Sequence, residues 1–237
     1  MLYFLKNPNY VFSNNGSLNE RIKLFFRLFF FCYSAIILLG LFVFLFDKIL
    51  VKEWMGKDSI FELYKINSKM VQNKFGLLMP LYIILIFPII EEFVFRYALN
   101  FKRNSIAVCV SLIIYRFLGS SYTQFNTSSF LDYFRLVFSV SVYFLLLRTL
   151  SEDFLSNIHK VYFPYIFYFS AVSFALVHIS NFSPIQYDIF YVYLLYVLPQ
   201  FAMGLFFGYI RLKQGFFGSV LLHSAINLPS GLSILYS

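Results

Sequence analysis

Charged residues are scarce in this chain. Only 13% of its 237 residues are Asp, Glu, Lys or Arg, and 60% are hydrophobic, whereas a soluble domain has roughly 25% charged residues. A core of this size cannot hide so much apolar surface from water. The composition therefore excludes an ordinary soluble domain and predicts an all-α polytopic membrane protein.

Cysteine is also rare. Cys32 and Cys109 both lie in apolar runs, so they provide neither a disulfide framework nor metal-ligand spacing. No Gly-x-Ser-x-Gly sequence is present and no cysteine lies near a histidine, so no nucleophilic side chain is evident. The net charge is +8, but the Lys and Arg residues cluster at the ends of apolar runs. That placement indicates membrane topology and a lipid bilayer partner, not nucleic acid.

Transmembrane helices need about 20 apolar residues, and about seven segments qualify, the third of which is short. They are 24–46, 77–99, 105–118, 131–150, 162–182, 189–210 and 216–236. The positive-inside rule then places the N-terminus in the cytoplasm. We expect residues 1–76 to form an N-terminal span and an interfacial segment, and residues 77–237 to form the main membrane bundle.

The interfacial segment has its own pattern. Ser59 and Glu62 have the spacing of a capping box. Ile60, Tyr64 and Met70 then fall on one apolar side, which predicts an amphipathic helix at the membrane surface.

Two adjacent carboxylates, Glu91 and Glu92, follow the apolar run 77–90. Charged groups in such a setting are costly and usually mark a functional site. Arg96 lies four residues after Glu92, so the two share a helix face and can pair, which leaves Glu91 to act as a general base. The alternative is that the helix reaches the membrane surface here and all three side chains are simply solvated.

Two of the three histidines, His178 and His223, also lie in apolar spans. Asn227 is one helical turn after His223, so both side chains can donate hydrogen bonds into one small space. Taken alone, His178 is explained as a packing residue, and His223 with Asn227 as a polar contact between helices. Together with Glu91, they provide a base for water and donors for an oxyanion, as hydrolysis of a carbonyl compound requires.

At these positions the chain resembles a known family. Glu91-Glu92-x-x-x-Arg96, Phe174-x-x-x-His178 and His223-x-x-x-Asn227 are similar, in order, to the three motifs of the CAAX protease and bacteriocin-processing (Abi) family of intramembrane peptidases.

The resemblance implies a role for each motif residue. Glu91 and His178 would activate water, and His223 and Asn227 would form the oxyanion site. Glu92, Arg96 and Phe174 would support them. The implied substrate is a membrane-associated peptide or protein, and the implied location is a bacterial plasma membrane.

The family has also been read as metal-dependent, and Glu91, His178 and His223 could hold a zinc ion with an open position. We favour the glutamate-type, cofactor-free reaction, because no His-Glu-x-x-His pair is present and Asn is a poor zinc ligand.

The chain departs from the family pattern in two places. Tyr97 stands where the family commonly has Gly, and about 80 residues separate Arg96 from His178. Segments 105–118 and 131–150 fill this gap and predict an inserted hairpin over 105–150.

Two other function classes fit a membrane bundle. One is a non-catalytic immunity or binding protein of the same fold. The other is a transporter with a proton relay, which would show paired broken helices in two related halves, and the sequence has no such symmetry.

Overall fold

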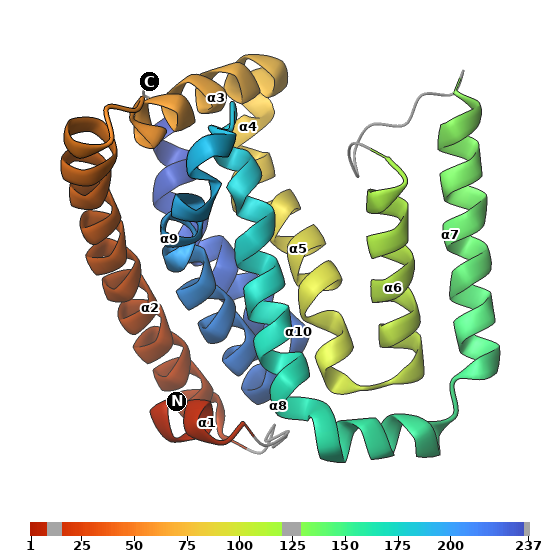
Figure 1. The fold of residues 1–237 in the computed structure, drawn as a ribbon. Coiled ribbons are helices and arrows are strands. Elements are labelled where there is room, and N and C mark those ends of the chain that lie inside the picture. Colours follow the sequence, from red (N-terminus) through yellow and green to blue (C-terminus); the bar gives the residue numbers. More distant parts are fainter. Residues whose placement is uncertain (9–15, 120–128, 235–237) are drawn as a thin grey trace. The chain divides into compact units, whose positions relative to one another are not determined.

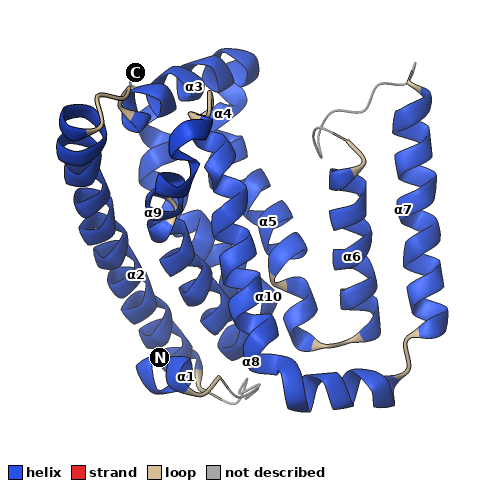
Figure 2. Ribbon diagram, in the orientation of Figure 1, coloured by secondary structure: helices blue, strands red, loops and turns tan. Residues whose placement is uncertain are grey.

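The computed structural model describes residues 1–8, 16–119 and 129–234, and within these ranges every regular element is helical (Figures 1 and 2). The α-helices are α1 (Leu2–Lys6), α2 (Leu18–Phe46), α3 (Ile60–Phe75), α4 (Met79–Leu81), α5 (Phe87–Phe95), α6 (Arg103–Phe117), α7 (Phe130–Thr149), α8 (Glu152–Val177), α9 (Tyr193–Tyr196) and α10 (Leu198–Ser233). Two segments are π-helical, Asp47–Trp54 and Tyr82–Ile86. Four are 3₁₀-helical: Gly76–Leu78, Tyr97–Asn100, His178–Phe182 and Tyr187–Val192.

The chain forms two compact units, which are described separately. The first unit comprises residues 1–10 and 90–167, and the second comprises residues 11–89 and 168–237. In the first unit, α6 and α7 lie side by side (Figure 1). In the second unit, α10 packs along α2 and against the π-helical segment Tyr82–Ile86. The predicted division at residue 76 stays a prediction.

Four helical stretches of the described chain are long and apolar enough to cross a membrane, or five if a bent pair is counted as one span. They are Leu18–Trp54, Gly76–Phe95, Phe130–Thr149, Glu152–Phe182 and the bent pair Tyr187–Tyr196 with Leu198–Ser233. The all-helical membrane fold is thus found, but seven spans are not confirmed. The 15 residues of α6 extend only about 22 Å, less than the ~30 Å of a hydrocarbon core. The predicted sixth and seventh spans both fall largely within α10, and residues 235–237 lie outside the described chain.

The helix α10 reverses direction at Gly215. This residue has φ 79° and ψ −171° inside an otherwise helical stretch. Phe207 and His223 stack with ring centroids 4.3 Å apart, whereas a continuous helix would hold their backbones about 24 Å apart. The two arms of α10, before and after Gly215, therefore fold back on each other.

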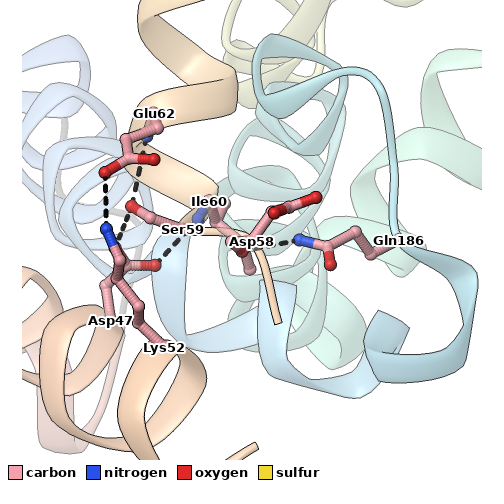
Figure 3. A network of polar contacts seen from close by, with 7 residues as sticks. All are labelled: Asp47, Lys52, Asp58, Ser59, Ile60, Glu62 and Gln186. Atoms are coloured by element: carbon pink, nitrogen blue, oxygen red, sulfur yellow. Dashed lines mark hydrogen bonds and ion pairs between the residues drawn. The ribbon is translucent and has the colours of Figure 1, made fainter. Parts of the chain in front are cut away.

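A buried carboxylate fixes the start of α3. Asp47 is 3% exposed and accepts hydrogen bonds from the Ser59 hydroxyl, from the Ile60 N–H at 2.9 Å and from the Tyr196 hydroxyl. Figure 3 shows Asp47, Ser59 and Ile60 converging between α3 and the π-helical segment after α2. One carboxylate thus joins the end of α2, the start of α3 and α9.

The predicted capping box at the start of α3 is only half formed. The Ser59 hydroxyl accepts from the Glu62 N–H at 3.2 Å, but the Glu62 carboxylate bonds to Lys52 at 2.9 Å instead of returning to Ser59. Nearby, a second ion pair joins Lys57 to Asp188. The hydrogen bond and negative charge of Asp188 raise the pKa of Lys57, and the pair is exposed, so it adds little to stability.

Replacing Gly215 by Ala should destabilise the protein through the backbone alone, because a Cβ there meets no atom within 4 Å. The φ and ψ of Gly215 lie in a region that costs other residues about 1–3 kcal/mol. Gly40 is a matched control: it also has open space and lies inside α2, where Ala is more favourable than Gly by up to about 1 kcal/mol. Thermal unfolding in detergent should separate G215A from G40A, and equal midpoints would contradict the reversal.

Replacing Tyr196 by Phe should remove one donor from the buried Asp47 carboxylate. Hydrogen bonds to charged groups contribute about 1.5–3 kcal/mol, so Y196F should lower the free energy of unfolding by about that amount. The matched change Y191F, at a side chain 63% exposed, should be nearly neutral in the same denaturation measurement.

Candidate functional site

The candidate residues lie in both units. Glu91, Glu92 and Arg96 belong to the first unit, and Phe174, His178, His223 and Asn227 belong to the second.

The first motif contains a fully buried ion pair. Arg96 Nη1 donates to Glu92 Oε1 at 2.9 Å, and both side chains have no exposed surface. The i, i+4 pairing predicted from the sequence is therefore present, and the alternative of solvated side chains is wrong for these two residues. Glu91, on a different side of the same helix, is half-buried, so this carboxylate keeps some accessible surface.

The helix that carries the first motif is irregular just before it. The Phe87 N–H bonds to the Tyr82 carbonyl five residues back, as in a π-helix. The next bond of that kind would run from residue 88 to Ile83, but Pro88 has no N–H. The Ile83 carbonyl therefore needs a donor from elsewhere, since an unsatisfied carbonyl in an apolar setting is costly.

Asn227 supplies that donor. Its Nδ2 donates to the Ile83 carbonyl at 3.1 Å, so the third motif binds the backbone of the segment that leads into the first. One turn later, a Cβ on Gly231 would lie 2.5 Å from Ile84 Cγ1, which shows how closely the two segments approach. The sequence analysis missed the Asn227–Ile83 contact, although Pro88 was the available signal.

His178 lies at the point where α8 ends and the 3₁₀ segment begins. Its Nδ1 is 2.7 Å from the Phe174 carbonyl. A carbonyl can only accept, so Nδ1 carries the hydrogen in this contact, and in a neutral imidazole Nε2 is then the acceptor nitrogen. Phe174, four residues earlier, thereby sets both the tautomer and the orientation of the imidazole.

The segment after His178 is held by α3. Asn67 Nδ2 donates to the Asn181 carbonyl at 2.9 Å, and the rings of Tyr64 and Phe182 lie 5.5 Å apart. The amphipathic helix predicted from the sequence therefore has a packed side as well as an outer one. Its contacts restrict the 3₁₀ turn that begins at His178.

His223 is packed among aromatic rings. It is 1% exposed, stacks on Phe207 with centroids 4.3 Å apart and meets Phe174 edge-on at 5.7 Å. The Phe174 ring also lies 4.6 Å from the His178 ring. In the second unit, both motif histidines thus contact the ring of Phe174.

Phe207 was not identified as a site residue from the sequence. It lies in the run from Gly204 to Gly208, and Gly204 explains how it reaches the histidine. A Cβ on Gly204 would be 3.0 Å from the Ala171 backbone, so α8 and the first arm of α10 meet closely there. This approach places Phe207 and Phe174 with ring centroids 6.1 Å apart.

Within the described residues, neither unit by itself gathers three His, Cys, Asp or Glu side chains able to hold a metal ion. In the second unit, His178 Nε2 is the ring atom placed to act as an acceptor, and His223 is covered on one ring face by Phe207. In this unit, each imidazole is therefore held in one orientation by its neighbours, His178 by a hydrogen bond and His223 by ring packing.

Replacing Arg96 by Met should be strongly destabilising, because it removes the cation that pairs with the buried Glu92 carboxylate. Breaking a buried ion pair costs about 3–5 kcal/mol. The double variant E92L/R96M, which removes both charges, should recover much of that loss. Thermal unfolding in detergent and the yield of monodisperse protein measure both effects. A single variant as stable as the double variant would contradict the pairing.

Comparison with known proteins places this chain in a family. The model of the type II CAAX prenyl endopeptidase Rce1-like family matches residues 73–229, which is well over half of the chain and includes every motif residue. No curated protein matches, and no solved structure matches. Together with the apolar helices, the match shows an integral membrane protein, and it supports a CAAX endopeptidase whose substrate is a membrane-associated peptide. The chain belongs to the type II CAAX prenyl endopeptidase Rce1-like family.

Proposed function

We propose that this chain is an intramembrane endopeptidase that hydrolyses a peptide bond through a water molecule activated by Glu91 and His178. The observation that carries the proposal is the family match over residues 73–229, which contains all three motifs. The absence of a serine or cysteine nucleophile motif in the sequence favours direct attack by water. That Glu91 meets the two histidines in one hydrated site stays a prediction.

Glu91 acts as the general base. Its carboxylate takes a proton from water as the water oxygen attacks the carbonyl carbon of the substrate amide. The buried Glu92–Arg96 pair supports this role. The pair holds the side of the helix next to Glu91 in place, and because Glu92 is occupied by Arg96 it does not compete with Glu91 for the water. The carbonyl π bond breaks, and an oxyanion forms on the substrate oxygen.

His178 holds the water from a second direction. Nδ1 donates to the Phe174 carbonyl, and Nε2 accepts a hydrogen bond from the water. This bond orients a lone pair of the water oxygen toward the carbonyl carbon of the substrate. When the tetrahedral intermediate collapses, the proton held by Glu91 passes to the departing nitrogen. The C–N bond breaks and leaves a carboxylic acid and an amine.

His223 and Asn227 form the oxyanion site. The Asn227 carboxamide has two N–H groups, one of which donates to Ile83 and fixes the side chain, so that the second is directed to the oxyanion. The rings of Phe174 and Phe207 pack against His223 and hold its imidazole in one orientation. Donors that are fixed before the reaction stabilise the developing charge without reorganisation, which contributes about 3–4 kcal/mol per donor in other enzymes.

We propose that the reaction is of the glutamate type and needs no metal. A metal-dependent reaction would instead draw on Glu91, His178 and His223 as zinc ligands. Cleavage that persists after treatment with a strong zinc chelator would support the glutamate type, and zinc-restored activity would favour the metal.

We also propose that the protein lies in a bacterial plasma membrane with its N-terminus in the cytoplasm. Protease accessibility of a tag at the N-terminus measures this orientation.

The substitutions E91Q and H178A should each abolish cleavage, because each removes one contact to the attacking water, while leaving the folded protein in the membrane. The assay compares farnesylated and unmodified peptides ending in a CAAX sequence, with purified protein in bilayers. Matched controls are E53Q, at an exposed acid, and H159A, at the one histidine outside the motifs; both should keep activity. Full activity in E91Q or H178A would refute the assignment.

The same variants separate a peptidase from an immunity protein of this fold. An immunity protein that acts by binding should still protect cells from a bacteriocin when it carries E91Q. A peptidase should lose protection together with cleavage.

A further inference from the structure

The predicted insertion contains an open groove. It lies between α6 and α7 in the first unit, has a volume of about 300 Å³ and is lined by Val108, Ser111, Leu112, Tyr115, Leu136, Ser139, Val140 and Tyr143. Cavities of this size hold small ligands in other proteins. None of these residues belongs to the three motifs.

The lining residues follow one helical stripe on each helix, at spacings of three and four. Such a stripe normally closes into a packed seam, but Ser111 and Ser139 are small and leave the middle open. Each hydroxyl donates to a carbonyl of its own helix, to Ala107 at 2.7 Å and to Arg135 at 2.7 Å. Their hydrogens are thus already used, and the middle of the groove is apolar in character.

Arginine contacts support both ends of this helix pair. At one end, Arg135 lies 4.3 Å over the Tyr115 ring and donates to its hydroxyl at 2.9 Å. The side chain fits because residue 119 is Gly, where a Cβ would be 1.7 Å from Arg135 Nη1. At the other end, Arg103 Nη1 donates to the Leu147 carbonyl at 3.1 Å. These contacts fix the helices at their ends while the centre stays unfilled.

The surroundings of the groove indicate what fills it. α7 is one of the stretches able to cross a membrane, and its outer side chains include Val137, 63% exposed, and Phe144, 61% exposed. The lining residues Leu136 and Val140 are themselves 44% and 46% exposed, so the groove opens on the apolar surface of this helix pair. Next to Tyr115, the exposed Arg116 carries a positive charge and donates from Nη1 to the Gly119 carbonyl at 2.9 Å. The other nearby arginine, Arg135, is paired with Asp132 at 2.9 Å.

We propose that the groove between α6 and α7 binds one acyl chain of an anionic phospholipid, with the lipid phosphate at Arg116. The apolar walls complement the chain by dispersion contacts, and the guanidinium complements the phosphate. The lipid fills the seam that the two serines leave open. This site is separate from the proposed peptidase chemistry and does not depend on it.

The test uses full-length protein in vesicles of phosphatidylcholine with phosphatidylglycerol, where a small fraction of one lipid carries a photoreactive group in its acyl chain. After illumination, residue-level mass spectrometry counts labels on the eight groove residues and, separately, on outer residues of α7 such as Val137 and Phe144. We expect the groove residues to be labelled more heavily than these outer residues, and more by phosphatidylglycerol than by phosphatidylcholine.

Groove-filling variants make the test specific. S111L and S139L should reduce labelling of the groove to the level of the outer face. S141L is the matched control, because Ser141 lies on α7, is exposed and makes the same bond to its own helix. It should leave groove labelling unchanged. R116Q should keep labelling but remove the preference for phosphatidylglycerol, whereas R148Q, at the far end of α7, should keep both.

Three outcomes would overturn the proposal. Groove labelling no stronger than that of the outer face would mean only ordinary lipid contact. Labelling unchanged in folded S111L and S139L, checked by thermal unfolding, would place the lipid elsewhere. Labelling of the groove by a photoreactive isoprenoid but not by either phospholipid would assign a different occupant.

Discussion

A polar group inside the lipid-embedded part of this chain must find its partner within the protein, because hydrocarbon offers none. This constraint explains several of the contacts that join distant segments of the fold. Asp47 collects Ser59, Ile60 and Tyr196. Each such bond joins segments that are distant in the sequence, so satisfying a polar group and assembling the bundle are the same event.

The same constraint shapes the candidate site. Pro88 removes a backbone donor, and the Ile83 carbonyl is satisfied by Asn227. Arg96 is buried with Glu92, and His178 donates to the carbonyl of Phe174. In each case one atom of a motif residue has a structural task, and this leaves its other polar atoms in a defined direction. The motif residues thus stabilise the fold, and the proposed chemistry would use the polar atoms that these contacts orient.

Aromatic packing completes the second unit. Phe174 contacts both histidines, and Phe207 covers His223. Ring contacts of this kind fix an imidazole without using either nitrogen. The close approach at Gly204 and the reversal at Gly215 are the backbone features that make these contacts possible. Gly204 matters for the close approach of two helices, and Gly215 matters for its backbone conformation.

The sequence by itself determined the all-helical membrane class, the three motifs and the Glu92–Arg96 pairing, since composition and i, i+4 spacing are local properties. It suggested seven spans, but α6 is too short and only four or five stretches of the described chain are long and apolar enough to cross a membrane, so that count is not confirmed. Only the tertiary structure showed that Asn227 binds Ile83, that Phe207 stacks on His223 and that Asp47 joins three elements. These contacts depend on which carbonyls and ring faces meet after the helices pack, and no local pattern in the chain specifies that.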